Sequence, residues 1–295
     1  MKRLLVLLGL VVAVAIVLLL ATRPSRLSPG ILPVHEPDTT NGERIFHAGG
    51  CASCHASGDD ASLPMMGGGL AMESPYGVFR VPNISPDPVH GIGRWTVLDF
   101  VNAMQSGASP DGRHYYPAFP YTSYARMRIE DLLDLKAFLD TLPAIQTRNL
   151  GHDLAFPWNV RAGIGLWKLL NLDTEAVVSD LPDVIQIRRG QYLVEGPGHC
   201  GECHTPRDWM GGLELERWLA GAPDPEGDGR VPNITRSGLQ DWSQGDIAYY
   251  LESGFTPDFD TVGGSMVKVQ KNMAMLPAED LEAIAAYLKA LPSPD

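Results

Sequence analysis

The sequence predicts an all-α fold in which two similar domains follow an N-terminal transmembrane helix. Segments of the first half of the chain recur in the second half at offsets of 147 to 150 residues, which indicates two homologous domains. Within each copy, apolar residues keep the three- and four-residue spacing that is typical of helices. At the N-terminus, an uncharged apolar run extends from Leu4 to Ala21.

Residues 1–28 are predicted to form a signal anchor. Lys2 and Arg3 precede eighteen uncharged residues, Leu4 to Ala21. This run exceeds the apolar core of about 7–15 residues in a cleaved signal peptide and lies at the lower limit of membrane-spanning length. We therefore expect an uncleaved helix in the bacterial inner membrane, with the remainder of the chain in the periplasm. Cleavage of this segment is the alternative.

Two repeats make up most of the chain. We define the first repeat as residues 37–143 and the second repeat as residues 184–295, and expect each to form one domain. The matching segments, first repeat before second, are Arg80–Ile84 and Arg230–Ile234, Trp95 and Trp242, Ser106-Gly107 and Ser253-Gly254, and Glu130–Leu132 and Glu279–Leu281. Their nearly constant offset implies similar loop lengths in the two domains.

Each repeat is predicted to contain a middle helix and a last helix. The motifs Thr96-x-x-Asp99 and Ser243-x-x-Asp246 resemble capping boxes and mark where the middle helices begin. Apolar stripes at helical spacing follow. In the first repeat they are Val97, Phe100, Val101 and Met104 in the middle helix, and Leu132, Leu135, Leu139 and Leu142 in the last helix. In the second repeat the last helix carries Leu281, Ile284, Leu288 and Leu291.

Residues 144–183 connect the two repeats. This connector contains Phe156-Pro157-Trp158 and the apolar run Gly163–Leu170. Such a composition is not that of a flexible tether. We expect the connector to pack against both domains as ordinary interdomain core.

Two copies of the motif C-x-x-C-H use every cysteine in the chain. They are Cys51-Ala-Ser-Cys54-His55 and Cys200-Gly-Glu-Cys203-His204. This spacing is the attachment signature of a c-type haem, in which two thiols bond to the haem vinyl groups and the histidine binds iron. The motifs predict two covalently bound haem c groups, with His55 and His204 as proximal iron ligands.

Other sites built from paired cysteines are weaker interpretations. The pairs of a four-cysteine zinc site usually lie about 15–20 residues apart, whereas Cys51 and Cys200 are separated by 149 positions. A thioredoxin-like dithiol needs a βαβ context that the flanking sequence does not indicate. Two structural disulfides remain possible in an exported protein.

The sixth iron ligand of the second haem is predicted to be a methionine. Haems used for electron transfer often carry a methionine opposite the histidine, and this ligand raises the reduction potential. It belongs on the loop between the middle and last helices. Met266 has the best loop position, and Met273 and Met275 are its competitors.

The haem motifs, the Val-Pro-Asn-Ile segments and the stretch His114–Met127 resemble the cytochrome c subunits of membrane-bound alcohol and gluconate dehydrogenases. The resemblance covers residues 41–292 and implies electron transfer. In that family we expect Tyr-Pro-Ala-Met-Pro-Tyr, whose methionine binds iron, but this chain has Phe119 in that place. Those subunits carry three haems, whereas this chain has two haem motifs. Met127 is the best substitute ligand for the first haem; it has an alternative role as a core side chain.

Two other states of the first haem stay open, namely ligation by His114 and an iron with no sixth ligand.

The wider pattern also resembles class I cytochrome c, in which the first and last helices cross. Gly42 and Gly190 would permit that close approach, and Phe138 and Tyr287 occupy equivalent positions in the last helices. The predicted fold is therefore two tandem class I cytochrome c-like domains.

Charge restricts the partners of the exported part. Without Lys2, Arg3, Arg23 and Arg26, 19 basic residues remain against 35 acidic ones, a formal charge of −16. This balance disfavours nucleic acid and is compatible with a basic redox protein. We expect an electron carrier between a dehydrogenase or respiratory complex and a downstream cytochrome or oxidase, and not an enzyme. The alternatives are a dihaem peroxidase or sulfur-compound oxidoreductase that reacts at the first haem, and a haem-based gas sensor.

Overall fold

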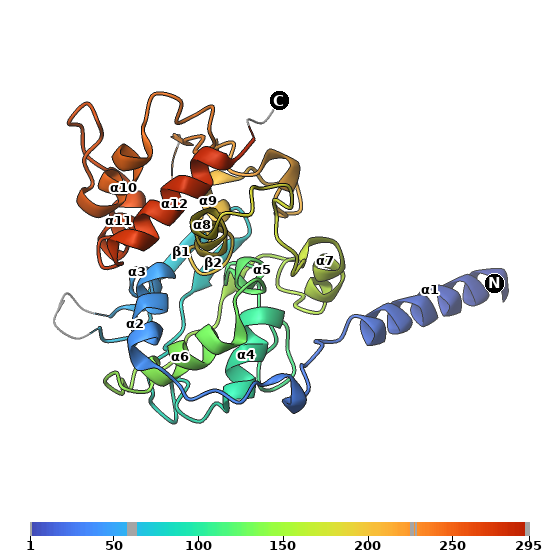
Figure 1. Cartoon of the computed structure of the whole chain (residues 1–295). Coiled ribbons are helices and arrows are strands. Elements are labelled where there is room, and N and C mark those ends of the chain that lie inside the picture. Colours follow the sequence, from blue (N-terminus) through green and yellow to red (C-terminus); the bar gives the residue numbers. More distant parts are fainter. Residues whose placement is uncertain (1, 58–63, 225–226, 228, 293–295) are drawn as a thin grey trace.

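The computed structural model of the chain describes residues 2–57, 64–224, 227 and 229–292 (Figure 1). Met1 and residues 293–295, at the ends of the first and last predicted segments, lie outside the described residues. Helix α1 (Lys2–Ala21) projects from the rest of the molecule (Figure 1). A short 3-10 helix, Pro29–Ile31, follows it.

Helices dominate both repeats. Those of the first repeat are α2 (Thr39–Ala48), α3 (Cys51–His55), α4 (Val97–Ser106), α5 (Tyr121–Tyr124) and α6 (Ile129–Leu139). Those of the second repeat are α8 (Ile185–Glu195), α9 (Gly201–His204), a 3-10 helix (Leu215–Arg217), α10 (Gln244–Ser253), α11 (Met266–Met273) and α12 (Ala278–Ala290). Among the described residues, the five α-helices of each repeat follow the same order, and the 3-10 helix Leu215–Arg217 has no counterpart in the first repeat.

The first and last helices of each repeat cross at a glycine. A Cβ atom added to Gly42 in α2 would lie 2.1 Å from the carbonyl oxygen of Asp134 in α6. The corresponding distance from Gly190 in α8 to the carbonyl oxygen of Ala283 in α12 is 1.9 Å. Both distances are far below van der Waals contact, so only glycine allows the two backbones to approach this closely. The predicted role of these glycines is confirmed.

Both predicted capping boxes are present. The Thr96 hydroxyl accepts a hydrogen bond from the Asp99 backbone N–H, and the Asp99 carboxylate accepts one from the Thr96 backbone N–H. Ser243 and Asp246 repeat the arrangement at the start of α10. The side chains thereby satisfy backbone donors that lack partners within the first turn of a helix.

Two small antiparallel sheets show that the all-α prediction is wrong. Strands β1 (Ala71–Ser74), β2 (Gly77–Arg80) and β3 (Asp153–Leu154) form one sheet, and β4 (Ala222–Pro223) and β5 (Arg230–Val231) form the other. These strands are two to four residues long. Alternation of apolar and polar residues predicts strands only over about four to eight residues, so the sequence contains too little signal for them.

The predicted transmembrane helix is also wrong. In the part of the chain that the structure describes, no helix combines the length and apolar character needed to cross a membrane. Because Lys2 and Arg3 occupy the first turn of α1, the uncharged run is eighteen residues, or about 27 Å at 1.5 Å per residue. The hydrocarbon core of a bilayer is about 30 Å thick.

The connector packs against both repeats. Its helix α7 (Gly163–Asn171) carries Lys168, whose Nζ donates hydrogen bonds to the carbonyl oxygens of Ser106 at 2.6 Å and Gly107 at 2.8 Å. On the same helix, the buried indole of Trp167 donates to the carbonyl oxygen of Met210 in the second repeat. The connector also contributes β3 to the three-stranded sheet.

Candidate haem sites

The first C-x-x-C-H motif forms the short helix α3, and a proline carbonyl orients its histidine. Nδ1 of His55 lies 2.8 Å from the carbonyl oxygen of Pro82. Because a carbonyl oxygen can only accept, Nδ1 carries the proton and Nε2 keeps the lone pair that binds a metal. In metal sites, such a hydrogen bond at the second ring nitrogen fixes the tautomer and the orientation of the histidine ligand.

The second motif repeats this geometry. Nδ1 of His204 lies 2.8 Å from the carbonyl oxygen of Pro232. Pro82 and Pro232 are equivalent residues of the repeated Arg-Val-Pro-Asn-Ile segment, which explains why that segment occurs twice. Burial lowers the pKa of both His55 and His204, so both imidazoles are neutral at pH 7, as iron ligands must be.

The residue after each proline is an asparagine whose side chain makes hydrogen bonds with neighbouring backbone groups. Asn83 donates from Nδ2 to the carbonyl oxygen of Ile145 at 2.6 Å and accepts at Oδ1 from the Ser85 backbone N–H. In the second repeat, Oδ1 of Asn233 accepts from the Thr235 backbone N–H at 2.8 Å. The Val-Pro-Asn-Ile segment therefore forms a rigid support behind each histidine.

The cysteine environment argues against a redox dithiol or a zinc site. Burial raises the pKa of Cys51 to about 12 and has the same effect on Cys200. Reactive dithiols and zinc ligands need an environment that lowers the pKa of the thiol and stabilises the thiolate. The apolar environment, the spacing and the oriented histidine all fit a covalently attached haem.

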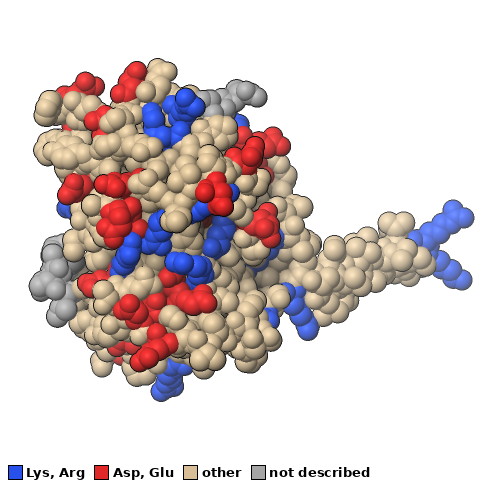
Figure 2. All heavy atoms as spheres, in the orientation of Figure 1, with Lys and Arg blue, Asp and Glu red and all other residues tan. Residues whose placement is uncertain are grey.

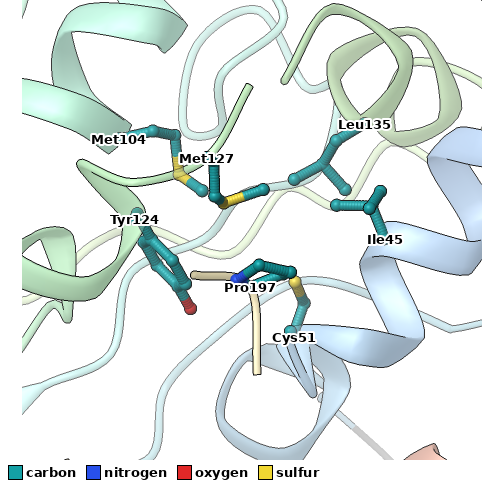
Figure 3. Close-up of a pocket in the computed structure, with 8 residues that line it drawn as sticks. Ile45, Cys51, Met104, Tyr124, Met127, Leu135 and Pro197 are labelled. Atoms are coloured by element: carbon teal, nitrogen blue, oxygen red, sulfur yellow. The ribbon is translucent and has the colours of Figure 1, made fainter. Parts of the chain in front are cut away.

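A small pocket lies beside Cys51 and contains two methionines (Figure 3). The side chains that line it are those of Ile45, Cys51, Met104, Tyr124, Met127, Leu135 and Pro197, with the backbone of Gly49. The thioethers of Met104 and Met127 lie next to each other on the side opposite Cys51 (Figure 3). Both methionines are buried. The structure thus brings the predicted ligand Met127 together with the first haem motif.

Met104 was not identified as a candidate ligand from the sequence. Its place in the apolar stripe of the middle helix favoured a core role, and nothing in the local pattern distinguished it. Met127 lies directly before the last helix, at a position where a sixth ligand is expected. Met104 and Met127 are therefore two candidate sulfur ligands for the first haem.

The alternative ligand His114 does not line this pocket. Its Nε2 is 2.8 Å from the carbonyl oxygen of Thr22, just beyond α1. Phe119, which replaces the expected methionine, is half-buried and makes edge contacts with the rings of Tyr115 and Tyr124. The substitution thus removes a ligand and adds to an aromatic cluster.

Met266 takes the place in the second repeat that Phe119 takes in the first. Each residue follows the glycine at the end of the middle helix, Gly107 or Gly254, by twelve positions. Met266 is the first residue of α11 and packs against the core of the second repeat. Of its competitors, Met273 is buried and Met275 is 62 % exposed. Exposure makes Met275 the weakest of the three candidates.

The two haem motifs contact the opposite repeats at equivalent positions. Ser53, inside the first motif, accepts a hydrogen bond from Asn272 of α11 at 3.0 Å. Glu202, the equivalent residue of the second motif, accepts one from Ser123 of α5 at 3.0 Å. Ser123 and Asn272 are themselves 149 residues apart, like Ser53 and Glu202. The repeats are thus related by an approximate twofold that brings the two motifs to one interface.

The loops before the motifs meet at the same interface. Nε2 of His199, directly before Cys200, is 3.2 Å from the carbonyl oxygen of Gly49. Pro197 of the second repeat lines the pocket beside Cys51 (Figure 3). The first haem site therefore includes residues of both repeats.

Comparisons with known proteins identify the family. The cytochrome c family model matches residues 39–143. A diheme cytochrome c-type protein of Cereibacter sphaeroides is 54% identical over 92% of this chain and 92% of its own length. The fructose dehydrogenase cytochrome subunit of Gluconobacter japonicus is 35% identical over 95% of this chain. The cytochrome c subunit of the quinone alcohol dehydrogenase of Gluconobacter oxydans is 32% identical over 85% of it.

The chain spans 59% and 54% of the lengths of the two dehydrogenase subunits, respectively. It matches the diheme protein almost from end to end, in keeping with its two attachment motifs. The prediction of two covalently bound haem c groups is confirmed. This chain belongs to the dihaem c-type cytochromes and acts in electron transfer.

Proposed function

We propose that this cytochrome relays single electrons in the periplasm, from a dehydrogenase to a downstream cytochrome or oxidase. When bound, the haem iron supplies the one-electron redox chemistry, and the chain holds each iron and sets the path between the two. The observation that carries the proposal is the shared interface of the two haem motifs. Hydrogen bonds from Asn272 to Ser53 and from Ser123 to Glu202 hold each motif against the other repeat.

We propose His55 and His204 as proximal ligands, with Met127 and Met266 completing the coordination. The support is the oriented Nδ1 atoms of the histidines, the burial of Met127 beside Cys51, and the place of Met266 at the first residue of α11, between the middle and last helices. A methionine opposite a histidine raises the reduction potential and leaves no open position for a substrate. This coordination suits a carrier.

The proposed donor is a dehydrogenase subunit. Relatives of this chain are cytochrome subunits of fructose, alcohol and gluconate dehydrogenases. The formal charge of −12 for the whole chain favours encounters with a basic partner surface. On the face drawn in Figure 2, Asp and Glu side chains alternate with groups of Lys and Arg, so a docking partner would meet both signs.

We propose a periplasmic location because of the cofactor. In bacteria, haem is attached to C-x-x-C-H motifs outside the cytoplasmic membrane. Fractionation of expressing cells, followed by haem staining of the gel, tests this proposal. Haem-bearing protein released with the periplasmic contents supports it, and haem-bearing protein confined to the cytoplasm contradicts it.

The relay is tested by following one electron within the purified protein. The oxidised protein is mixed in a stopped-flow instrument with a reductant that supplies less than one electron per chain. The absorption α-bands of the two haems are then followed while the electron redistributes between them. We expect redistribution within one molecule, with a rate independent of protein concentration. Asn272→Ala should slow it, because the contact with Ser53 is lost. Lys271→Ala, an exposed neighbour on α11, is the matched control.

A rate that rises in proportion to protein concentration would contradict an internal relay.

The alternative is a peroxidase or sulfur-compound oxidoreductase that uses the first haem, and its support is the loss of the expected methionine at Phe119. Two sulfur atoms beside Cys51 weaken that support. Rapid peroxide turnover together with a high-spin first haem would favour the enzyme.

A further inference from the structure

Glu195, the last residue of α8, is a buried carboxylate surrounded by hydrogen-bond donors. It is 2 % exposed. Oε2 accepts from the backbone N–H of Val177 at 2.7 Å, and Oε1 accepts from the hydroxyl of Tyr287 at 2.7 Å. Oε1 also accepts from Val178 N–H and from Nε2 of Gln191. All of these bonds are accepted by the carboxylate, which is the pattern of the ionised, acceptor-only form, so Glu195 places a negative charge inside the second repeat.

Two contacts link this charge to the second haem motif. The Tyr287 hydroxyl, which donates to Glu195, accepts from the indole N–H of Trp218 at 3.0 Å. The Trp218 ring lies directly on Gly201, where an added Cβ would be 2.1 Å from ring atom Cζ3. Gly201 is one of the two residues between Cys200 and Cys203. The network therefore runs from the buried charge to the turn that carries the haem.

The first repeat lacks this charge. Five residues beyond the helix-crossing glycine, Glu195 corresponds to His47, and Tyr287 of the last helix corresponds to Phe138. His47 is half-buried, and burial lowers the pKa of its imidazole, which is therefore neutral at pH 7. Phe138 has no hydroxyl to donate. Glu195 is thus a buried negative charge that has no counterpart at the equivalent position of the first repeat.

We propose that Glu195 lowers the reduction potential of the second haem, the haem attached at Cys200 and Cys203. Oxidation adds one positive charge to a haem, and a negative charge in a medium of low dielectric constant stabilises that oxidised form. Burial and local hydrogen bonding are recognised means by which a protein sets this potential. The inference rests on the proposed electron relay, because a fixed difference between two potentials gives the transfer a direction.

Arg126 carries a charge of opposite sign near Glu195 and reduces this effect. Burial lowers the pKa of Arg126 and the charge of Glu195 raises it, so the two side chains influence each other. The guanidinium nevertheless donates to the carbonyl oxygens of Glu175 and Thr122. Glu195 accepts its hydrogen bonds instead from the neutral donors named above, so Arg126 acts on it through charge alone.

The test compares Glu195→Gln with the unaltered holoprotein by spectroelectrochemical titration of both haems. Glutamine keeps the shape and removes the charge. We expect one of the two redox waves to move upward by about tenfold in its equilibrium constant, which is about 59 mV for one electron, while the other wave stays. Glu282→Gln removes the same charge from the exposed face of α12 and should move neither wave.

A second variant guards against simple structural damage. Tyr287→Phe keeps the Glu195 charge and removes one of its donors, so the carboxylate is less well neutralised and the same wave should move downward. Opposite signs for the two variants are expected from a local field and not from loosened packing. Unchanged waves in Glu195→Gln, or equal shifts of both, overturn the inference. Fewer than two haems per chain by pyridine haemochrome would instead count against the proposed relay.

Discussion

Arg44 of the first repeat donates a hydrogen bond from Nε to the Asp280 carboxylate of the second repeat, at 2.5 Å. The equivalent residues make the reciprocal contact, because the hydroxyl of Tyr192 in the second repeat donates to Asp131 of the first. Each last helix therefore begins with an aspartate that binds the first helix of the other repeat. This is the self-complementary pattern of a symmetric dimer interface, here within one chain.

Loss of the Arg44 side chain should loosen this interface. Asp280 is fully buried, and Arg189 of its own repeat also binds it, so Arg44→Met leaves the carboxylate partly paired. We expect a loss of about 2 kcal/mol in the free energy of unfolding, the contribution of a hydrogen bond to a charged group. Urea denaturation measures it. Arg113→Met, which breaks the exposed pair with Asp111, should cost less than about 1 kcal/mol. Equal losses in the two variants would argue against a special role for Arg44.

His35 should make stability depend on pH near neutrality. A hydrogen bond with Asp134, 2.6 Å away, raises the pKa of His35 above its ordinary value, and burial opposes this only in part. A histidine whose pKa is raised by folding contributes its stabilisation fully below pH 6.5. The contribution is lost as the pH rises through the pKa of the folded state.

The stability difference between the protein and His35→Gln should therefore shrink as the pH rises from about 6 to above that folded-state pKa. Urea unfolding of both proteins across this range measures the difference. A difference that grows with pH would contradict a pKa of His35 that is raised by its hydrogen bond with Asp134.

The local features of the fold could be predicted from the sequence because their signals lie within a few residues. The capping boxes at Thr96 and Ser243 and the glycine at the helix crossing, Gly42, are examples. The cross-repeat contacts could not, because Arg44 and Asp280 are 236 positions apart and neither carries a local pattern that names its partner. Folding of both repeats and the connector must first place them together.

The haem sites divide in the same way. Covalent haem attachment could be predicted because each C-x-x-C-H motif consists of five consecutive residues. The role of Pro82 behind His55 was not predicted, although the recurrence of its segment marked it as important. The sequence does not distinguish Met104 as a ligand, because a methionine that faces the core and one that faces a haem occupy the same apolar stripe of a helix. The transmembrane prediction failed because its apolar run sits at the limit of the required length.

Met127 is expected to be the sulfur ligand of the first haem, and Met104 its neighbour. A methionine–iron bond gives a charge-transfer band in the near-infrared, and two such haems give twice the intensity of one. Met127→Leu should remove half of the band and lower one reduction potential, because the methionine ligand raises it. Met104→Leu makes the same change in the same pocket and should keep the full band. The reverse result would assign the bond to Met104.

Each C-x-x-C-H motif should carry one haem independently of the other. Alanine at both Cys51 and Cys54 removes the thiols of the first motif and leaves the second intact. We expect the pyridine haemochrome assay to fall from two haems per chain to one, while the Met266-dependent half of the near-infrared band persists. Because Pro197 and His199 contact the first site, its loss should also destabilise the interface. Loss of both haems would show that attachment at the second motif depends on the first.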